Sequence, residues 1–301
     1  EQCSPLRYSF NFRLRFNRRN GQDKLPTQCD AKPVSSAILI PGSRNKRIGE
    51  ALIRHRKSAI EKMELWENGP QFEQSKHFRP GTDSVLLADF VNIGTRRRGI
   101  DLGCGSGILP LLLLVRSERL HMTGLEINSE AARVARENMA ANALETRCDI
   151  ISGDIRRCRE LFKTGQFDLV VSNPPYFAAG SGRQSPNADK AAARGEKLCS
   201  LEDICRAASY LCRTGGAFCL VHRAERLADV ICLLRETGFE AKRLRTVSHS
   251  AEKEPSLVLV EARRGANAGL KIMPPLFICG GDGRESAEIK RICHREDGHE
   301  R

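Results

Sequence analysis

The sequence predicts an α/β protein with an open, mainly parallel sheet that carries helices on both of its faces. Apolar runs typical of buried strands alternate with helical patterns from residue 82 to residue 237, and two further strand patterns follow. Two motifs stand directly after strand patterns: Asp-Leu-Gly-Cys-Gly-Ser-Gly at 101–107 and Asn-Pro-Pro-Tyr at 173–176. Ligands bind at the carboxyl ends of strands in such sheets, so both motifs are expected at one functional edge.

Each element is predicted from local signals. Thr82 and Asp83 are expected to cap a first helix and Asn128 a later one, because their side-chain oxygens can accept N–H groups of a first helical turn. The expected helices cover 82–93, 108–115, 128–143, 201–212 and 224–237, and the expected strands cover 99–102, 122–127, 148–152, 167–172, 217–221, 242–247 and 256–262. The last two strands follow one another without a helix between them, which predicts a C-terminal antiparallel hairpin.

The chain is expected to have three parts. Residues 1–62 carry most of the positive excess within a net charge of +12, and we expect them to form a basic, poorly ordered extension. A nucleic-acid-binding arm and translation upstream of a native start at Met63 are both compatible with this segment. Residues 63–278 carry the regular pattern of a folded domain, and residues 279–301 are expected to form a polar tail.

Composition excludes several classes of protein. The sequence has no apolar run of about 18 residues, so we expect no membrane span. Its 12 cysteines include no Cys-x-x-Cys pair and no Cys–His cluster of the zinc type, which predicts reduced thiols and no metal centre. No secretion signal is recognisable at the start, so we expect a cytoplasmic protein. The oligomeric state cannot be predicted from these features.

The loop at 101–107 fits a positively charged cofactor. Gly103, Gly105 and Gly107 allow a tight turn and a close approach to a ligand because glycine has no Cβ atom. Their spacing differs from the Gly-x-Gly-x-x-Gly spacing of dinucleotide-binding loops. Asp101 would repel a pyrophosphate but would attract the ammonium group of a methionine moiety. The loop therefore favours S-adenosylmethionine over a nicotinamide cofactor.

Two more carboxylates follow expected strands. Glu126 ends the second strand, where it can accept hydrogen bonds from ribose hydroxyls, and Asp154 follows the third, where it can receive an adenine amino group. Each could instead be a surface or capping carboxylate, but their positions at successive strand ends favour a nucleoside site. Cys104 is interpreted as a small space-filling residue rather than a nucleophile.

The Asn-Pro-Pro-Tyr motif predicts a site for a planar amine. The prolines hold the turn rigid. The side-chain oxygen of Asn173 and the carbonyl of Pro174 can each accept one N–H, which draws the amine nitrogen toward tetrahedral geometry and directs its lone pair at a methyl donor. Tyr176 can stack on the acceptor, which contributes about 1–3 kcal/mol for a nucleobase. The alternative is a Pro-Pro turn that merely ends a strand.

These motifs resemble the class I S-adenosylmethionine-dependent methyltransferases, a Rossmann-like family that uses Asn-Pro-Pro-Tyr to methylate amines. Segments 78–83, 86–88, 173–182, 193–196 and 274–278 also resemble bacterial enzymes that methylate N6 of adenosine 37 in a valine tRNA. This resemblance implies that Phe78, Arg79, Thr82 and Asp83 form a lid beside the methionine end of the cofactor. The chain departs from the subfamily at Gly195, where a histidine is typical, and so lacks a side chain that could touch RNA.

The resemblance implies a tRNA (adenine-N6) methyltransferase. Tyr176 and Phe177 would then contact the adenosine. Basic residues in the long segment after the motif and in a later strand are candidates for phosphate contacts, with a solvated basic face as the alternative. They are Arg183, Lys190, Arg194, Lys197, Lys242, Arg243 and Arg245.

Three other functions remain open. A protein glutamine N5-methyltransferase acting on a release factor uses the same tetrapeptide on an amide, although residues 1–62 do not resemble the helical domain that precedes the core in those enzymes. A DNA adenine methyltransferase would need a target-reading insertion of about 60 residues, and none interrupts the pattern. An RNA-binding module that had lost activity would not need an intact acceptor motif.

Overall fold

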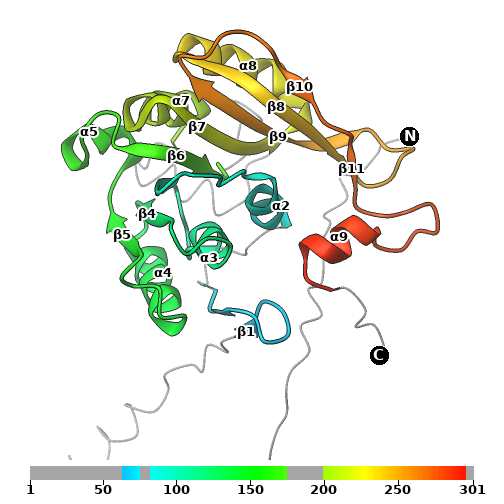
Figure 1. The fold of residues 1–301 in the computed structure, drawn as a ribbon, viewed down its shortest axis with the longest axis horizontal. Coiled ribbons are helices and arrows are strands. Elements are labelled where there is room, and N and C mark those ends of the chain that lie inside the picture. Colours follow the sequence, from blue (N-terminus) through cyan, green and yellow to red (C-terminus); the bar gives the residue numbers. More distant parts are fainter. Residues whose placement is uncertain (1–62, 75–81, 175–198, 296–301) are drawn as a thin grey trace, which may run out of the picture. The chain divides into compact units, whose positions relative to one another are not determined.

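The computed structural model describes residues 63–74, 82–174 and 199–295 (Figure 1). The expected extension at 1–62 and the lid residues Phe78 and Arg79 lie outside the described residues, as does the segment from 175 to 198. The described fold belongs almost entirely to the second of two units, Glu64–Arg301.

A mixed sheet forms the centre of this unit. Its strand order is β10-β8-β9-β7-β6-β3-β4-β5, and β11 also pairs with β8. The long strands are β3 (Arg98–Leu102), β4 (His121–Glu126), β5 (Cys148–Ser152), β6 (Phe167–Ser172), β7 (Cys212–Arg223), β8 (Phe239–Ser248) and β9 (Pro255–Arg264). The short strands are β1 (Met63–Glu64) and β2 (Gln71–Phe72), which pair with each other, and β10 (Lys271–Ile272) and β11 (Leu276–Phe277).

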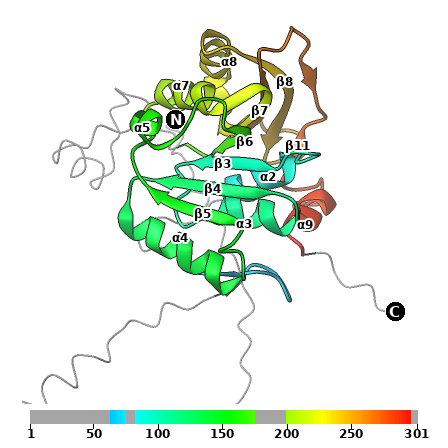
Figure 2. The same cartoon turned by 60° about the vertical axis from the view of Figure 1, so that its left-hand side comes forward.

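The predicted fold class is confirmed. Strands β3 to β7 run parallel to one another, whereas β9 pairs antiparallel with both β7 and β8. Figures 1 and 2 together show helices on both faces of the sheet. The helices are α2 (Thr82–Phe90), α3 (Ile108–Val115), α4 (Ser129–Ala141), α5 (Cys158–Leu161), α7 (Leu201–Leu211), α8 (Leu227–Glu236) and α9 (Ala287–Ile292), with 3-10 turns η1 (Ile155–Arg157) and η2 (Ala224–Arg226). Among the described residues, none of the helices is long and apolar enough to cross a membrane.

Helix α4 begins as the sequence predicted. The side-chain oxygen of Asn128 accepts the N–H groups of Glu130 and Ala131, each at 3.0 Å. These N–H groups have no partner within the helix, so the cap satisfies them. Helix α2 begins at Thr82, which places Thr82 and Asp83 in its first turn, and their capping role stays a prediction.

Alternate residues of the central strands fill two separate cores. Along β6, Leu169 and Val171 belong to the core that contains residues of α2, α3 and α4. Val170, between them, belongs to the core that contains residues of α7 and α8. A parallel strand covered on both faces has a continuous apolar sequence, which is why β6 was predicted with its correct bounds.

The strand order reverses between β3 and β6. From β3 the chain continues to β4 and β5 on one side and then crosses back to β6 and β7 on the other. Pairing of β3 with β6 extends to Asp101 and Val171. One residue later, the buried hydroxyl of Ser172 donates to the carbonyl of Leu102 at 2.8 Å. Ser172 therefore joins the two strands at the switch point, where sheets of this kind bind ligands.

The segment after Ile278 contributes to the core. The tail predicted from residue 279 contains α9, and its Ile289 and Ile292 are buried in the same core as α2 and α3. Just beyond α9, the His294 ring stacks on Trp66 with ring centroids 4.0 Å apart. A helix of six residues gives too few periodic positions to be recognised from the sequence.

A buried charge cluster joins β9 to its neighbours. Glu261 on β9 is 2% exposed and pairs with Arg243 at 2.6 Å, Arg263 at 3.1 Å and Arg96 at 3.7 Å. The Arg243 guanidinium also lies over the Phe90 ring, 4.5 Å from its centroid, and so connects the cluster to α2. Three guanidinium groups thus share one buried carboxylate as their counter-ion.

We expect Glu261→Ala to lower the free energy of unfolding by about 3–5 kcal/mol, because it leaves partly buried arginines without their partner. The matched control is Glu202→Ala, which breaks the exposed pair of Glu202 with Arg206 on α7 and should cost less than about 1 kcal/mol. Urea denaturation of both variants measures the difference. Equal, small losses would show that the cluster does not stabilise the fold.

Candidate active site

The glycine loop follows β3 and has the tight turn that its sequence predicted. Gly103, Gly105 and Gly107 have φ angles of 81°, 55° and 83°, in the left-handed region that favours glycine. The N–H of Gly103 donates to the carbonyl of Leu125 at 2.8 Å, which fixes the start of the loop to the end of β4. A side chain at these positions would strain the backbone, so the glycines maintain the loop's path.

Asp101 lies buried at the carboxyl end of β3. It is 2% exposed, and its Oδ1 accepts no hydrogen bond within the described part of the chain. Burial, followed by the charge of nearby Glu126, raises the pKa of Asp101 well above its ordinary value. A buried carboxylate oxygen without a partner is costly, and a cation bound beside it would favour the ionised form of Asp101. The site therefore fits the ammonium group of a methionine moiety.

Glu126 ends β4 and connects the glycine loop with α4. Its Oε2 accepts the N–H of Gly105 at 2.8 Å, and its Oε1 accepts the N–H of Asn128 at 2.9 Å. Each carboxylate oxygen can accept a second hydrogen bond. Glu126 can thus hold the loop and still accept further hydrogen bonds, and its contact with ribose hydroxyls stays a prediction. The next residue, Ile127, is 65% exposed, so an apolar side chain lies at the surface directly after Glu126.

Asp154 has a structural partner in this fold. It is the N-cap of η1, since its Oδ1 accepts the N–H of Arg156 at 2.9 Å. The Arg156 guanidinium also binds both carboxylate oxygens, with Nε 2.9 Å from Oδ2 and 3.0 Å from Oδ1. The hydrogen bond to Arg156 lowers the pKa of Asp154. Contact with an adenine amino group would have to add to these interactions or replace them.

The acceptor motif begins beside the glycine loop. Asn173 directly follows β6, two residues after the Val171 that pairs with Asp101. The Asn173 side chain reaches helix α2, where its Nδ2 donates to the Ser84 hydroxyl at 2.9 Å. Pro174 is buried, and the predicted substrate residues of the 175–198 segment lie outside the described part of the chain. These are Tyr176, Phe177, Arg183, Lys190, Arg194 and Lys197.

Asn138 of α4 connects the glycine loop to the segment that follows β2. It is 2% exposed, and its Oδ1 accepts the N–H of Glu73 at 2.7 Å. Its Nδ2 donates to the carbonyls of Glu73 at 2.8 Å and Ser106 at 2.9 Å. One turn later, Asn142 binds the N–H and carbonyl of Gln71 in the same way, at 2.9 Å and 2.7 Å. Of the two amides, only Asn138 is bonded to the glycine loop.

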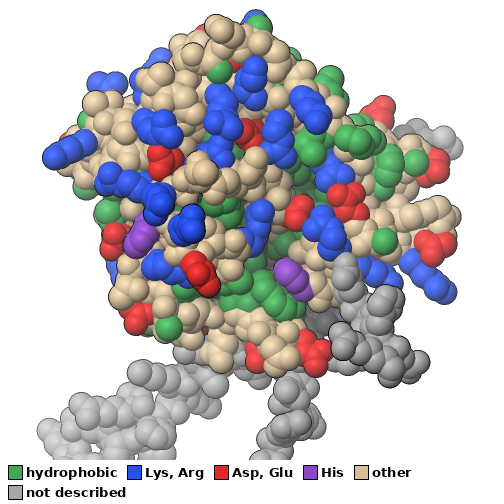
Figure 3. Space-filling view, viewed as in Figure 1, with side chains coloured by type: hydrophobic (Ala, Val, Ile, Leu, Met, Phe, Trp, Pro, Cys, Tyr) green, Lys and Arg blue, Asp and Glu red, His purple; other side chains and the backbone are tan. Residues whose placement is uncertain are grey.

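The later basic residues are engaged within the protein. Figure 3 shows Lys and Arg side chains gathered on the face over β8 and β9. However, Arg243 pairs with Glu261, and Arg245 pairs with Glu288 through two contacts of 2.8 Å. Lys242 donates to the carbonyl of Asn267 at 3.2 Å. The polar groups of these three residues hold β8 to its neighbours, and the phosphate-binding role expected of them stays a prediction.

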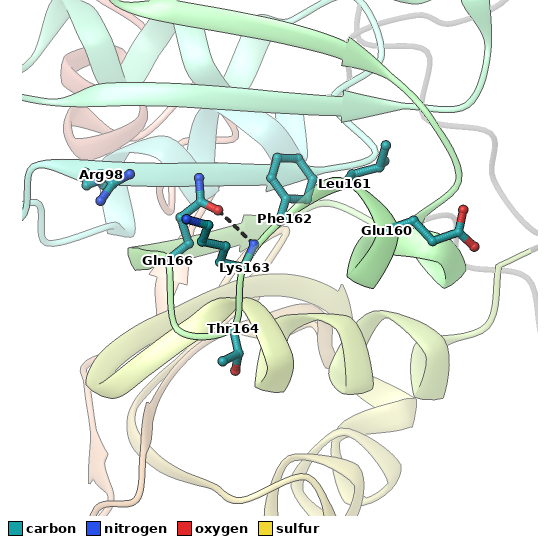
Figure 4. Close-up of a pocket in the computed structure, with 7 residues that line it drawn as sticks. All are labelled: Arg98, Glu160, Leu161, Phe162, Lys163, Thr164 and Gln166. Carbon is teal, nitrogen blue, oxygen red and sulfur yellow. Dashed lines mark hydrogen bonds between the residues drawn. The ribbon is translucent and has the colours of Figure 1, made fainter.

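A surface pocket of about 630 Å³ lies at the other end of the strands. Arg98, the first residue of β3, and Gln166, which precedes β6, line it (Figure 4). Gln166 accepts the N–H of Lys163 at 3.0 Å and so closes the turn before β6. The pocket is at the amino ends of β3 and β6, away from Asp101 and Asn173, and is therefore separate from the candidate active site.

Sequence reasoning missed three residues at the candidate site: Ser84, Ile127 and Asn138. None of them belongs to a sequence motif. Ile127 is recognised by its exposure in the structure, and Ser84 and Asn138 are recognised by their hydrogen-bond partners. Cys104 was correctly interpreted, because it is 4% exposed and burial raises the pKa of its thiol. Within the described ranges, no group of three or more His, Cys, Asp or Glu side chains could hold a metal ion.

A glycine turn, a buried acid and an Asn-Pro pair at neighbouring strand ends of this sheet are the features expected of a methyltransferase that uses S-adenosylmethionine. The family model of the methyltransferase small domain matches residues 75–236. The chain belongs to this family.

Curated relatives agree with this assignment, and a solved structure shares the fold. The chain is 33% identical over 188 residues to the tRNA1(Val) (adenine(37)-N6)-methyltransferase of Aeromonas hydrophila, covering 62% of this chain and 77% of that protein. The enzyme of the same name from Dickeya chrysanthemi is 33% identical over 217 residues, covering 70% and 85%. A predicted O-methyltransferase from Agrobacterium tumefaciens shares the fold, with a TM-score of 0.58 and 22% identity over 71% of this chain and 96% of that chain.

The raised pKa of Asp101 predicts pH-dependent cofactor binding. Pairing with an ammonium group requires the carboxylate, so affinity should increase as the pH rises through the raised pKa of the free protein and then level off. Calorimetry with S-adenosylhomocysteine, which keeps the ammonium group, tests this from about pH 5 to about pH 7.5, below the pKa of about 8 of an α-amino group. Asp101→Asn should remove the dependence, and exposed Asp149→Asn should retain it. A wild-type affinity independent of pH would contradict the predicted role.

The two amide contacts of α4 provide a matched pair of variants. Asn138→Ala should raise the dissociation constant for S-adenosylhomocysteine about 10-fold, because Ser106 in the glycine loop loses its partner. Asn142→Ala removes the same kind of contact from Gln71 and should change the constant less than about 2-fold. Binding constants and melting temperatures are measured for both. Equal effects on binding would exclude a specific role for Asn138.

Proposed function

We propose that this methyltransferase modifies N6 of an adenosine in tRNA, with adenosine 37 of a valine tRNA as the specific target. The observation that carries the proposal is the position of Asn173 at the end of β6, directly across the switch point from the glycine loop and Asp101. The names of the curated relatives support the choice of acceptor. With a tRNA substrate, we expect the enzyme to act in the cytoplasm.

The donor side of the site is built from the chain's own backbone and carboxylates. S-adenosylmethionine supplies an electrophilic methyl group on a sulfonium. Asp101 would hold the ammonium group, Glu126 would accept from the ribose hydroxyls, and the loop of Gly103, Gly105 and Gly107 would lie against the cofactor. Thr82 in the first turn of α2 and Arg79 before it would complete the methionine end, as the family resemblance implies.

The acceptor side acts by orientation. The exocyclic nitrogen of adenine is a poor nucleophile because its lone pair is delocalised into the ring. The Asn173 Oδ1 and the Pro174 carbonyl would each accept one N–H, which directs the lone pair out of the ring plane. No side chain of unusual basicity is required, since the methylated amine loses its proton after transfer. Catalysis then results from positioning and from preorganised dipoles.

Access to N6 requires the adenosine to leave its stack. Proteins that read single-stranded RNA place such bases against aromatic rings, a role that Tyr176 and Phe177 would fill. Arg183, Lys190 and Arg194 lie in the same segment of the sequence and would contact the neighbouring phosphates.

The test is methylation of total tRNA lacking the modification, followed by nucleoside mass spectrometry. Wild-type protein should form N6-methyladenosine. Asn173→Ala should lower turnover by about 100-fold, the usual cost of losing one preorganised catalytic hydrogen bond. The control is Asn92→Ala, an exposed asparagine after α2. No N6-methyladenosine above the Asn173→Ala background would reject the proposal, and N5-methylglutamine on a release-factor peptide would establish the alternative.

A further inference from the structure

We propose that Ser84 is a positioning residue that sets the orientation of the Asn173 amide for methyl transfer. The proposal rests on the function proposed above and adds a residue outside both motifs. Its basis is the hydrogen bond of 2.9 Å from the Asn173 Nδ2 to the Ser84 Oγ, which joins the end of β6 to helix α2.

The orientation of an asparagine amide matters at this position. Its oxygen and its NH2 group lie on opposite sides of the same carbon, and the two flipped arrangements have nearly the same shape. An amine acceptor presents N–H donors, so the Asn173 oxygen must face it. An NH2 group in that place would point its own N–H donors at the N–H donors of the amine, and no hydrogen bond could form. In the structure the Ser84 hydroxyl accepts from the NH2 group, which places Oδ1 away from α2. Because a hydroxyl can also donate to an amide oxygen, Ser84 anchors the plane of the amide beside α2, and the N–H donors of the bound amine select the arrangement with Oδ1 toward them.

Ser84 is placed for this role by helix α2. It is 3% exposed, in a helix whose Leu87 and Ala88, three and four residues further on, are also buried. These three residues share one face of the helix, so the hydroxyl is a polar group on an otherwise apolar surface. A buried hydroxyl needs a hydrogen-bond partner, and Asn173 provides one.

The helix that carries Ser84 is itself held in place. Arg116, which follows α3, donates to the carbonyls of Ala88 and Val91, the latter at 3.2 Å. On the strand side, the Ser172 hydroxyl fixes the backbone next to Asn173 through the Leu102 carbonyl. Ser172 thus restrains the backbone before the acceptor motif, and Ser84 restrains the side chain of Asn173.

A single hydrogen bond of this kind shifts an equilibrium by roughly 2- to 10-fold. We therefore expect Ser84→Ala to lower kcat about 10-fold, while the dissociation constants for S-adenosylhomocysteine and tRNA change less than about 2-fold. Ser84→Thr keeps the hydroxyl and should restore kcat to within about 3-fold of wild type. Ser248→Ala is the matched control, because Ser248 is 3% exposed and lies on β8 outside the site.

These measurements separate positioning from a structural role. A serine that served only to stabilise the fold would lower the melting temperature and leave kcat unchanged once the protein is folded. Loss of kcat in Ser84→Ala without rescue by Ser84→Thr would overturn the proposal, and so would an equal loss in Ser248→Ala. An unchanged kcat in Ser84→Ala would overturn it as well.

A second readout does not depend on the acceptor. In protein labelled with 15N-asparagine, the side-chain NH2 signal of Asn173 is assigned by its absence from Asn173→Ala. We expect Ser84→Ala to shift this signal and lower its heteronuclear NOE, and Ser84→Thr to retain both. An unaltered signal in Ser84→Ala would show that Ser84 does not hold the amide. Wild-type protein that fails to methylate tRNA would reject the proposed function alone, because this spectrum still tests the contact.

Discussion

The candidate active site depends on one electrostatic constraint: a carboxylate buried at the switch point of the sheet, one oxygen of which, Oδ1, accepts no hydrogen bond from the residues that the structure describes. Asp101 cannot be moved toward solvent, because β3 is paired on both sides and covered on both faces. The nearby negative charge of Glu126 makes ionisation still less favourable. Such a group destabilises the empty protein above its ordinary pKa and gains most from a bound cation.

The surrounding residues keep this carboxylate at a fixed distance from the acceptor motif. Ser172 joins the diverging ends of β3 and β6, and Glu126 holds the glycine loop from the side of β4. Asn138 reaches the same loop from α4. Each contact is made by a polar side chain to a backbone group. The loop's conformation is thereby set by at least three elements, which lowers the ordering cost when a ligand binds.

The sequence predicted the features that depend on local pattern. The bounds of α3, β5 and β6 were correct because apolar runs between turn signals mark buried elements. Strands β7, β8 and β9 are longer than expected, since charged residues at their ends, such as Arg263 and Arg264, interrupt the apolar pattern although the ladder continues. Ser84 and Asn138 could not be recognised, because their roles depend on partners 89 and 32 residues away in the chain.

Helix α9 has a consequence for how the enzyme is made. It packs in the core beside α2, and its Arg291 pairs with Asp89 of that helix at 3.3 Å. Helix α2 is therefore completed by a helix about 200 residues later in the chain. A ribosome must synthesise all the residues from α2 to α9 before α2 can pack against this neighbour. Messages with premature stop codons ahead of α9 would yield chains that retain both motifs but lack this support.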